Sequence, residues 1–281
     1  MFSNRDIADY YDQTEVHYRR FWKLRNYFAI HYGIWGKGVR TFGQALENTN
    51  RILAEKAGIE SSHVVLDAGC GIGGSAFYLA RNFGCHVTGI SLSQKQIDTA
   101  GRISKTLSLD HRLQFEVQDF TNTGYRANRF DVVWALESAG SAPDKKAFLQ
   151  EAHRLLKPGG KLILADYFKN RDKPASDQPL LDSWLKLWAI SDLVTTGSFR
   201  LLLENSGFQD QHVFDYTREI MPAARRMFLS SLAGSTPSLL YNFIHKNTSR
   251  FAKEHYKSGF LQYKALRKGL WEYKVILAKK K

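Results

Sequence analysis

The sequence predicts an α/β fold with a seven-stranded, mostly parallel sheet, and three observations support this prediction. Seven short apolar runs with strand character follow one another along the chain, and most are separated by stretches of helical character. One run passes directly into a glycine-rich turn and then a helix, as in doubly wound sheets. The chain has 281 residues, of which 43% are hydrophobic, which is enough for one such domain with additions.

The first strand and its turn form the most informative segment. Residues 64–74 read Val-Val-Leu-Asp-Ala-Gly-Cys-Gly-Ile-Gly-Gly, and a helix is expected from Ser75. Glycines let the backbone turn tightly and approach a bound ligand closely. They also satisfy the dinucleotide pattern G-x-G-x-x-G, which is a weak signal by itself. Asp67, two residues before the first glycine, would repel a pyrophosphate and suits a ligand with an ammonium group and hydroxyls. A dinucleotide site and a purely structural turn are the alternatives.

The next two strands deliver polar residues to the carboxyl edge of the sheet. The second strand is expected at Cys85–Ile90 and is followed by Ser91-Leu-Ser-Gln-Lys-Gln96. Within that stretch, Ser93 is expected to cap the next helix. The third strand is expected at Leu113–Val117 and leads to Gln118-Asp119-Phe120.

Four more strands complete the sheet. They are expected, in order, at Phe130–Leu136, Lys161–Asp166, His212–Tyr216 and Trp271–Ala278, the last of them antiparallel. Glu137 follows the first of these four strands directly, and the turn Lys157-Pro-Gly-Gly160 precedes the second.

Taken in this order, the segments resemble the motifs of class I S-adenosylmethionine-dependent methyltransferases. Residues 64–74 resemble motif I of that family, and Leu155-Leu-Lys-Pro-Gly-Gly-Lys-Leu162 resembles a characteristic turn of its fold. Gly89-Ile-Ser-Leu-Ser-x-x-Gln96 resembles the Gly-Val-Thr-Leu-Ser-x-x-Gln variant of the subgroup that holds tocopherol, sterol and cyclopropane-fatty-acid methyltransferases. The resemblance covers residues 60–216 and the closing strand, and it implies a Rossmann-like core.

The resemblance also implies a methyl donor, S-adenosylmethionine, which leaves as S-adenosylhomocysteine, and it implies no metal. Asp119 matches the family residue that accepts the adenine amino group; its alternative is a solvated loop carboxylate. In most members of this family, an acidic residue at the end of the second strand binds the ribose hydroxyls. That acid is missing here, so the role passes to Ser91, Leu92 and Gln96. The residues implied to hold the donor are Asp67, Gly69, Cys70, Gly71, Ser91, Leu92, Gln96, Asp119, Phe120 and Leu136.

Two segments outside the matched core are expected to form a helical cap over the acceptor, residues 1–58 and residues 218–268. Residues 59–217 and 269–281 then form the donor-binding core. Both cap segments carry aromatic residues at helical spacing, which usually indicates core packing. An aromatic lid can also exclude water and hold a flat or aliphatic acceptor.

An N-terminal pattern adds candidate acceptor residues. Tyr10-Tyr-Asp followed by His31-Tyr-Gly-Ile-Trp35 resembles a pattern of tocopherol-like methyltransferases, whose residues close over the donor and touch the acceptor. The resemblance implies such roles for Tyr10, Tyr11 and His31. A packed or helix-capping imidazole is the alternative for His31. The predicted catalytic residues are Glu137, His31 and Tyr11.

One departure from the subgroup bears on the reaction. The subgroup commonly has Glu-Ser-x-Glu-His-Met-x-Asp after the fourth strand, whereas this chain has Glu137-Ser-Ala-Gly-Ser-Ala-Pro-Asp144. Gly140 and Ser141 therefore replace a glutamate and a histidine that often binds the acceptor or accepts a proton. A serine is no general base at neutral pH without a partner. This favours methylation of nitrogen or carbon by in-line displacement, which depends mainly on positioning, over methylation of oxygen.

The net charge of +13 is concentrated late in the chain, because residues 216–281 contain 14 lysine and arginine residues and three acidic ones. This indicates either a solvated basic surface or attraction to an anionic acceptor or an anionic membrane surface. Nucleic acid is disfavoured, because the basic residues are mixed with many apolar ones. The expected acceptor is a small lipophilic molecule with the option of a phosphate or carboxylate, and no oligomeric state is predicted.

Composition also limits the class of protein. No run of about 18 uncharged apolar residues predicts a membrane span, and the N-terminus lacks the apolar core of a secretion signal. Cys70 and Cys85 lie inside core elements, which favours a reducing compartment over a disulfide framework. No Cys/His spacing resembles a metal site. We therefore expect a cytoplasmic enzyme. The alternatives are an RNA or protein methyltransferase and a non-catalytic domain that binds the donor.

Overall fold

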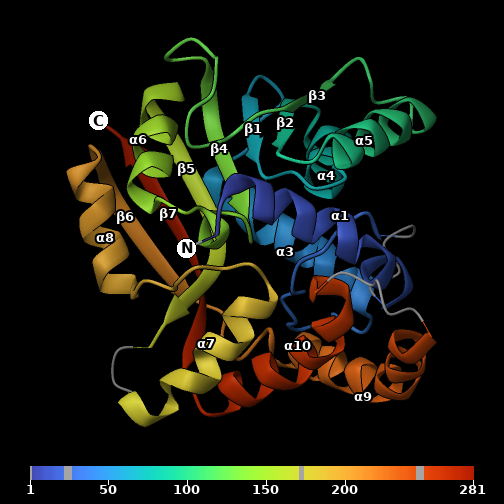
Figure 1. Cartoon of the computed structure of the whole chain (residues 1–281). Helices are drawn as coiled ribbons and strands as arrows, with labels where there is room; N and C mark the ends of the chain where they lie inside the picture. The colour runs from blue at the N-terminus through green and yellow to red at the C-terminus, as the bar shows by residue number, and fades with distance from the viewer. Residues whose placement is uncertain (1, 22–26, 171–173, 245–249) are drawn as a thin grey trace.

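The computed structural model of the chain contains the predicted seven-stranded sheet (Figure 1). It describes residues 2–21, 27–170, 174–244 and 250–281. The strands are β1 Val64–Ala68, β2 His86–Ser91, β3 Leu113–Val117, β4 Phe130–Leu136, β5 Leu156–Lys169, β6 Phe208–Asp215 and β7 Trp271–Lys280. Their spatial order is β3-β2-β1-β4-β5-β7-β6. Strands β1 to β5 pair in parallel, and β7 runs antiparallel to both β5 and β6. The predicted fold class is therefore confirmed.

Four strands differ from their predicted bounds: β2 and β7 by one or two residues, and β5 and β6 by an earlier start. β5 begins at Leu156, five residues before the predicted start, because Leu156 still pairs with Phe130. The pairing then shifts by a bulge at the glycine turn and resumes between Lys161 and Val132. β6 begins at Phe208, because the turn Asn205-Ser-Gly leads straight into the sheet.

Helices cover both faces of the sheet. On one face lie α3 Phe42–Ala57, α4 Gly74–Phe83 and α5 Gln94–Thr106; on the other lie α6 Lys145–Leu155 and α8 Thr196–Asn205. Each face of the sheet packs against its helices in a hydrophobic core, and successive residues of a strand point to opposite faces. Trp134, for example, packs in one core and Val133 in the other. The burial of both faces explains why the parallel strands read as continuous apolar runs.

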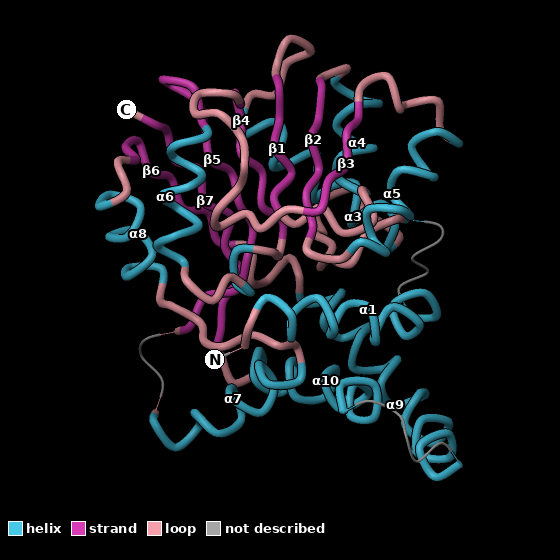
Figure 2. The backbone as a smooth tube through the Cα atoms, turned by 45° about the horizontal axis from the view of Figure 1, so that its top comes forward, coloured by secondary structure: helices cyan, strands magenta, loops and turns pink. Residues whose placement is uncertain are grey.

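Four further helices form a separate layer beyond the carboxyl ends of the parallel strands (Figure 2). They are α1 Asn4–Phe21, α7 Gln178–Leu187, α9 Met221–Ile244 and α10 Arg250–Arg267, and α10 contacts the other three. This layer draws on both segments predicted as a cap, of which residues 22–26 and 245–249 lie outside the described residues. It also includes α7, which lies in the range predicted as core. In contrast, α3 lies in the range predicted as cap but packs against β5 and β7 of the sheet. In the described part of the chain, no helix combines the length and apolarity needed to cross a bilayer.

Candidate active site

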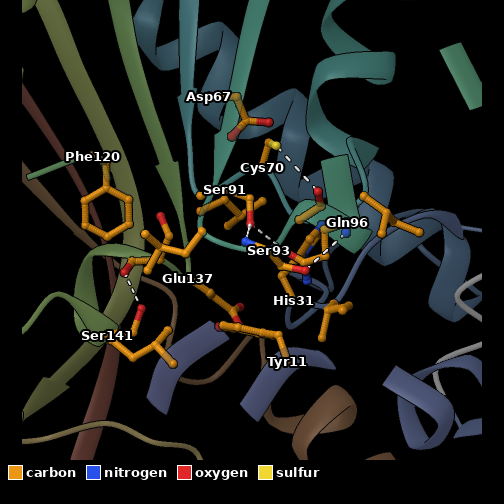
Figure 3. Close-up of a pocket in the computed structure, with 18 of the residues that line it drawn as sticks. Tyr11, His31, Asp67, Cys70, Ser91, Ser93, Gln96, Phe120, Glu137 and Ser141 are labelled. Carbon is orange, nitrogen blue, oxygen red and sulfur yellow. Dashed lines mark hydrogen bonds between the residues drawn. The ribbon is translucent and has the colours of Figure 1, made fainter. Parts of the chain in front are cut away.

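A large cavity opens at the carboxyl ends of β1, β2 and β4, with α1 lying across it. It encloses about 960 Å³ of empty space, including its open mouth. All ten residues predicted to hold the donor line it: Asp67, Gly69, Cys70, Gly71, Ser91, Leu92, Gln96, Asp119, Phe120 and Leu136. The predicted catalytic residues Tyr11, His31 and Glu137 line it as well (Figure 3).

Asp67 supplies a buried carboxylate to this larger cavity. Its side chain is 1% exposed, and its Oδ2 atom has no hydrogen-bond partner among the described residues. Burial raises the pKa of Asp67 to about 7, although the Ala76 backbone N–H partly offsets the effect. An oxygen of this kind is costly to bury unless a ligand donates to it. The site therefore fits a ligand that brings an ammonium group or a hydroxyl.

The glycine turn brings backbone rather than side chains to the cavity. Gly69 has φ +90°, and a Cβ atom there would lie 2.4 Å from the Cβ atom of Ser138. The Ser138 hydroxyl in turn donates to the Ala68 carbonyl at 2.5 Å, which ties the end of β1 to the loop after β4. A side chain at position 69 would be strained in conformation and would also force these two segments apart.

Polar contacts fasten α1 over the larger cavity. Asn4 Nδ2 donates to Asp119 Oδ2 at 2.6 Å, and the Ser93 hydroxyl donates to Asp12 Oδ1 at 2.5 Å. Asp119 is therefore held by α1 and is not a merely solvated loop carboxylate. The prediction that Ser93 caps the following helix is confirmed, because Ser93 Oγ also accepts from the backbone N–H of Gln96, three positions further on. The Ser91 hydroxyl donates to Gln96 Oε1 at 2.7 Å, so two of the predicted ribose partners contact each other.

A smaller cavity of about 490 Å³ adjoins the larger one. The two share Tyr11, Ile30, Glu137 and Ser141. The remaining lining of the smaller cavity is mostly aromatic and comes from distant parts of the chain: Tyr10, Tyr32, Tyr167, Trp188, Ile190 and Met227.

Of these six residues, only Tyr10 was predicted as a site residue. Tyr32 lies inside the quoted His31–Trp35 pattern, and Tyr167 directly follows the predicted fifth strand, so both carried a local signal. Met227 lies in the segment 218–268 that was predicted to cover the acceptor, and Trp188 carried no signal.

Glu137 lies where the two cavities meet, and three donors hold its carboxylate. Oε1 accepts from the Tyr32 backbone N–H at 2.7 Å and from the Tyr273 hydroxyl at 2.7 Å, and Oε2 accepts from the Tyr167 hydroxyl. Burial raises the pKa of Glu137 to about 8 against the effect of these donors. Its backbone has φ +53°, a conformation that a non-glycine residue adopts at a cost of about 1–3 kcal/mol and most often at functional sites.

Of the other two predicted catalytic residues, His31 is a weak base and Tyr11 a weak acid. His31 is 5% exposed, its Nδ1 lies 2.9 Å from the Tyr32 carbonyl oxygen, and burial lowers the pKa of its imidazole to about 4. Burial and the nearby Asp166 and Glu137 carboxylates raise the pKa of the Tyr11 phenol. The imidazole and the phenol are therefore both neutral at pH 7. Of the tyrosine pair, Tyr11 lines both cavities and Tyr10 lines only the smaller one.

The structure explains why glycine stands at position 140. The Gly140 N–H donates to Asp166 Oδ2 at 2.6 Å, and a Cβ atom on Gly140 would lie 2.6 Å from Asp166 Oδ1. Asp166 is 2% exposed and also accepts from the Tyr167 N–H at 2.8 Å. Lys145 Nζ donates to the Gly140 and Ala142 carbonyls, both at 2.8 Å, on the other side of this loop. A glutamate at position 140 has no room here.

The basic residues of the late chain stay outside both cavities. No lysine or arginine occurs among the described residues that line either one; the carboxylic side chains there are Asp67, Asp119 and Glu137. The expected contact between the basic segment and an anionic acceptor therefore has no counterpart in the described lining.

Comparison with known proteins gives a consistent result. The profile of the family described as "Methyltransferase domain" matches residues 66–164. Methyltransferase GfsG from Streptomyces halstedii is 29% identical over 223 residues, 78% of this chain and 78% of that protein. A 2-methyl-6-phytyl-1,4-hydroquinone methyltransferase from Synechocystis is 31% identical over 235 residues, 79% of this chain and 71% of that protein. The chain spans only 38% of phosphoethanolamine N-methyltransferase 1 from Arabidopsis thaliana, with 32% identity over 192 residues.

Solved structures share the fold over the whole chain. The cyclopropane synthase MmaA2 from Mycobacterium tuberculosis has a TM-score of 0.83 at 15% identity, with 100% of this chain and 99% of that one covered. The cyclase SpnF has a TM-score of 0.79 at 22% identity, with 99% and 96% covered. At such identities the likeness concerns the fold alone, and the second example shows that the fold also serves other chemistry.

Proposed function

Because the chain belongs to the S-adenosylmethionine-dependent methyltransferases that act on small molecules, we propose that its larger cavity holds the methyl donor and its smaller cavity holds a lipophilic acceptor. The observation that carries this proposal is the junction of the two cavities at Tyr11, Ile30, Glu137 and Ser141. A donor in one cavity and an acceptor in the other would meet there. The methylated atom is nitrogen or carbon.

The residues of the larger cavity suit the donor group by group. Bound S-adenosylmethionine supplies an electrophilic methyl group on a positively charged sulfur. Asp67 would receive the donor's ammonium group or a hydroxyl at its unpartnered Oδ2. Ser91, Leu92 and Gln96 would line the ribose, and Asp119 with Phe120 would line the adenine. Holding both reactants in line removes much of the entropic barrier, so positioning alone can supply a large share of the rate.

The smaller cavity favours a small acceptor over a macromolecule. Apart from Glu137 and Ser141, its walls are aromatic and aliphatic side chains, which can pack against an apolar body. The hydroquinone methyltransferase relative is named for an apolar acceptor of this kind. A cavity with about 490 Å³ of empty space, its open mouth included, does not suit a nucleic acid strand or a folded protein. We also propose a cytoplasmic location, in keeping with the unpaired thiols of Cys70 and Cys85.

Methyl transfer from labelled S-adenosylmethionine into a fractionated cell extract tests this function. We expect label in the lipid or small-molecule fraction with the wild-type chain and none with Asp67→Asn. Label confined to protein or nucleic acid would contradict the proposal. No label in any fraction, with S-adenosylhomocysteine still bound, would identify a domain that binds the donor without catalysis.

Donor binding is expected to release a proton. Because burial raises the pKa of Asp67 to about 7, the side chain is neutral below that pH, and a cationic ligand must deprotonate it. The affinity for S-adenosylhomocysteine should therefore rise about tenfold between about pH 6 and about pH 8. Calorimetry in two buffers of different ionisation enthalpy measures the proton directly. Equal affinity at both pH values, or a pH dependence retained in Asp67→Asn, would contradict this assignment.

A further inference from the structure

The carboxylate of Glu137 has one acceptor position left. A carboxylate offers about four lone-pair positions on its two oxygens. Two of them, on Oε1, receive the Tyr32 N–H and the Tyr273 hydroxyl, and one, on Oε2, receives the Tyr167 hydroxyl. Since Glu137 lines both cavities, the remaining position on Oε2 belongs to the part of the site where the reactants meet.

Aromatic rings surround this carboxylate on the acceptor side. The rings of Tyr32 and Tyr167 pack edge to face with centroids 5.8 Å apart, and Trp188 packs against Tyr167 at 5.7 Å. Tyr10 and Tyr11 line the same cavity and pack edge to face at 5.1 Å. Faces of electron-rich rings attract organic cations, and the attraction increases where water is excluded.

The charge of the lining has one sign. Glu137 is the acidic residue among the described residues of the smaller cavity, and the larger cavity adds Asp67 and Asp119. Because burial raises the pKa of Glu137 to about 8, an ammonium group that binds there displaces the carboxyl proton, as at Asp67. A phosphate or carboxylate in such surroundings would be desolvated against like charges without a basic partner. A positive charge would find both a carboxylate and ring faces.

We propose, on the basis of the function proposed above, that the acceptor is an amine carried on an apolar body, which binds with its nitrogen between Glu137 Oε2 and the ring faces of Tyr32, Tyr167 and Trp188. An amine bound as an ammonium ion first gives its proton to the ionised Glu137 carboxylate, which passes it to water. The freed nitrogen lone pair forms the new N–C bond, the carbon–sulfur bond of the donor breaks, and its electron pair stays on sulfur. A secondary amine leaves as a tertiary ammonium ion and a tertiary amine as a quaternary ammonium ion, so no further proton moves in the transfer step.

A pair of probes with the same shape tests the charge preference. Phenethyltrimethylammonium and its neutral carbon counterpart, 3,3-dimethylbutylbenzene, are titrated into the full chain saturated with S-adenosylhomocysteine. The ammonium probe should bind about tenfold tighter or more. In Glu137→Gln the preference should largely disappear. The matched control is Glu116→Gln, which removes a carboxylate bonded to Tyr125 outside both cavities and should keep the preference.

If Glu137→Gln does not fold, a second variant still tests the role of Glu137. Tyr273→Phe keeps the ring and removes one of the three donors to Glu137, so at a pH well above 8, where the carboxyl group is ionised, the carboxylate gains acceptor capacity and the preference for the ammonium probe should increase. Equal binding of the two probes to the wild type, or a preference that ignores Glu137, would overturn the amine assignment.

The outcomes separate the two proposals. Failure of S-adenosylhomocysteine to bind contradicts the proposed function itself. Tight binding of S-adenosylhomocysteine without discrimination between the probes contradicts the amine alone. Methyl label recovered in acid-extractable amines of the cell extract supports the amine, and label recovered only in neutral lipids contradicts it while the methyltransferase function stands.

Discussion

Asp67→Asn is expected to weaken S-adenosylhomocysteine binding about 100-fold, or roughly 3 kcal/mol, because an amide replaces the carboxylate that meets the ligand's donors. The shape of the side chain is kept, so the cavity is preserved. Calorimetric titration of the wild type and the variant measures the change.

The same substitution should not lower the free energy of unfolding. The folded-state pKa of Asp67 is raised to about 7, so its contribution to stability is present at low pH and is lost as the pH rises through that value. Asparagine cannot ionise and escapes this loss. Glu151→Gln is the matched control: this buried glutamate bonds Thr123 and Arg154 away from both cavities, so its loss should reduce stability and leave the affinity unchanged. Unaltered affinity in Asp67→Asn would make Asp67 a structural residue only.

Gly140→Glu is expected to destabilise the chain by about 3 kcal/mol or more, although it restores the residue that the subgroup commonly carries. Its Cβ atom would lie 2.6 Å from Asp166 Oδ1, and Asp166 cannot withdraw without breaking its bonds to the N–H groups of Gly140 and Tyr167. The new side chain would also bring a second carboxylate beside a buried one. Urea unfolding of wild type and variant measures the difference.

Two further substitutions identify the cause. Gly124 is exposed, and a Cβ atom there would meet nothing within 4 Å, so Gly124→Glu should change stability by no more than about 0.5 kcal/mol. Shortening Asp166 to alanine in the Gly140→Glu background should recover part of the loss, as expected for two residues in direct contact. A Gly140→Glu chain as stable as the wild type would show that this loop yields easily and that Asp166 does not determine the residue at position 140.

The sheet and the larger cavity could be predicted because the residues that define each strand and each part of the site lie close together in the sequence. β3 and β4 have the predicted bounds, since each is a short apolar run between polar turns. The residues of the larger cavity directly follow strand ends, and in a parallel sheet those ends meet at one edge. Neighbours in the sequence of a motif therefore become neighbours in the site.

The smaller cavity could not be predicted in the same way, because its residues meet only through tertiary packing. Trp188 follows α7, Met227 belongs to α9, and Tyr32 lies before α3, and no periodicity within one segment places these three together. The departure at Gly140 was visible in the sequence, but its cause was not, because Asp166 lies 26 positions away on another strand. Resemblance to a subgroup could not reveal a carboxylate that takes the space of the usual side chain.

The position of β7 has a consequence for how the protein is made. This strand is inserted between β5 and β6, and it carries Tyr273, whose hydroxyl holds Glu137 from a distance of 136 residues along the chain. While residues 271–280 are still inside the ribosome, β6 has no neighbour to pair with, and Glu137 lacks one of its donors. A premature stop codon shortly before Trp271 would leave a nascent chain with most of the motifs that identify it, yet without the strand that carries Tyr273, one of the three donors to Glu137. Such fragments should be substrates for chaperones and proteases rather than partly active enzymes.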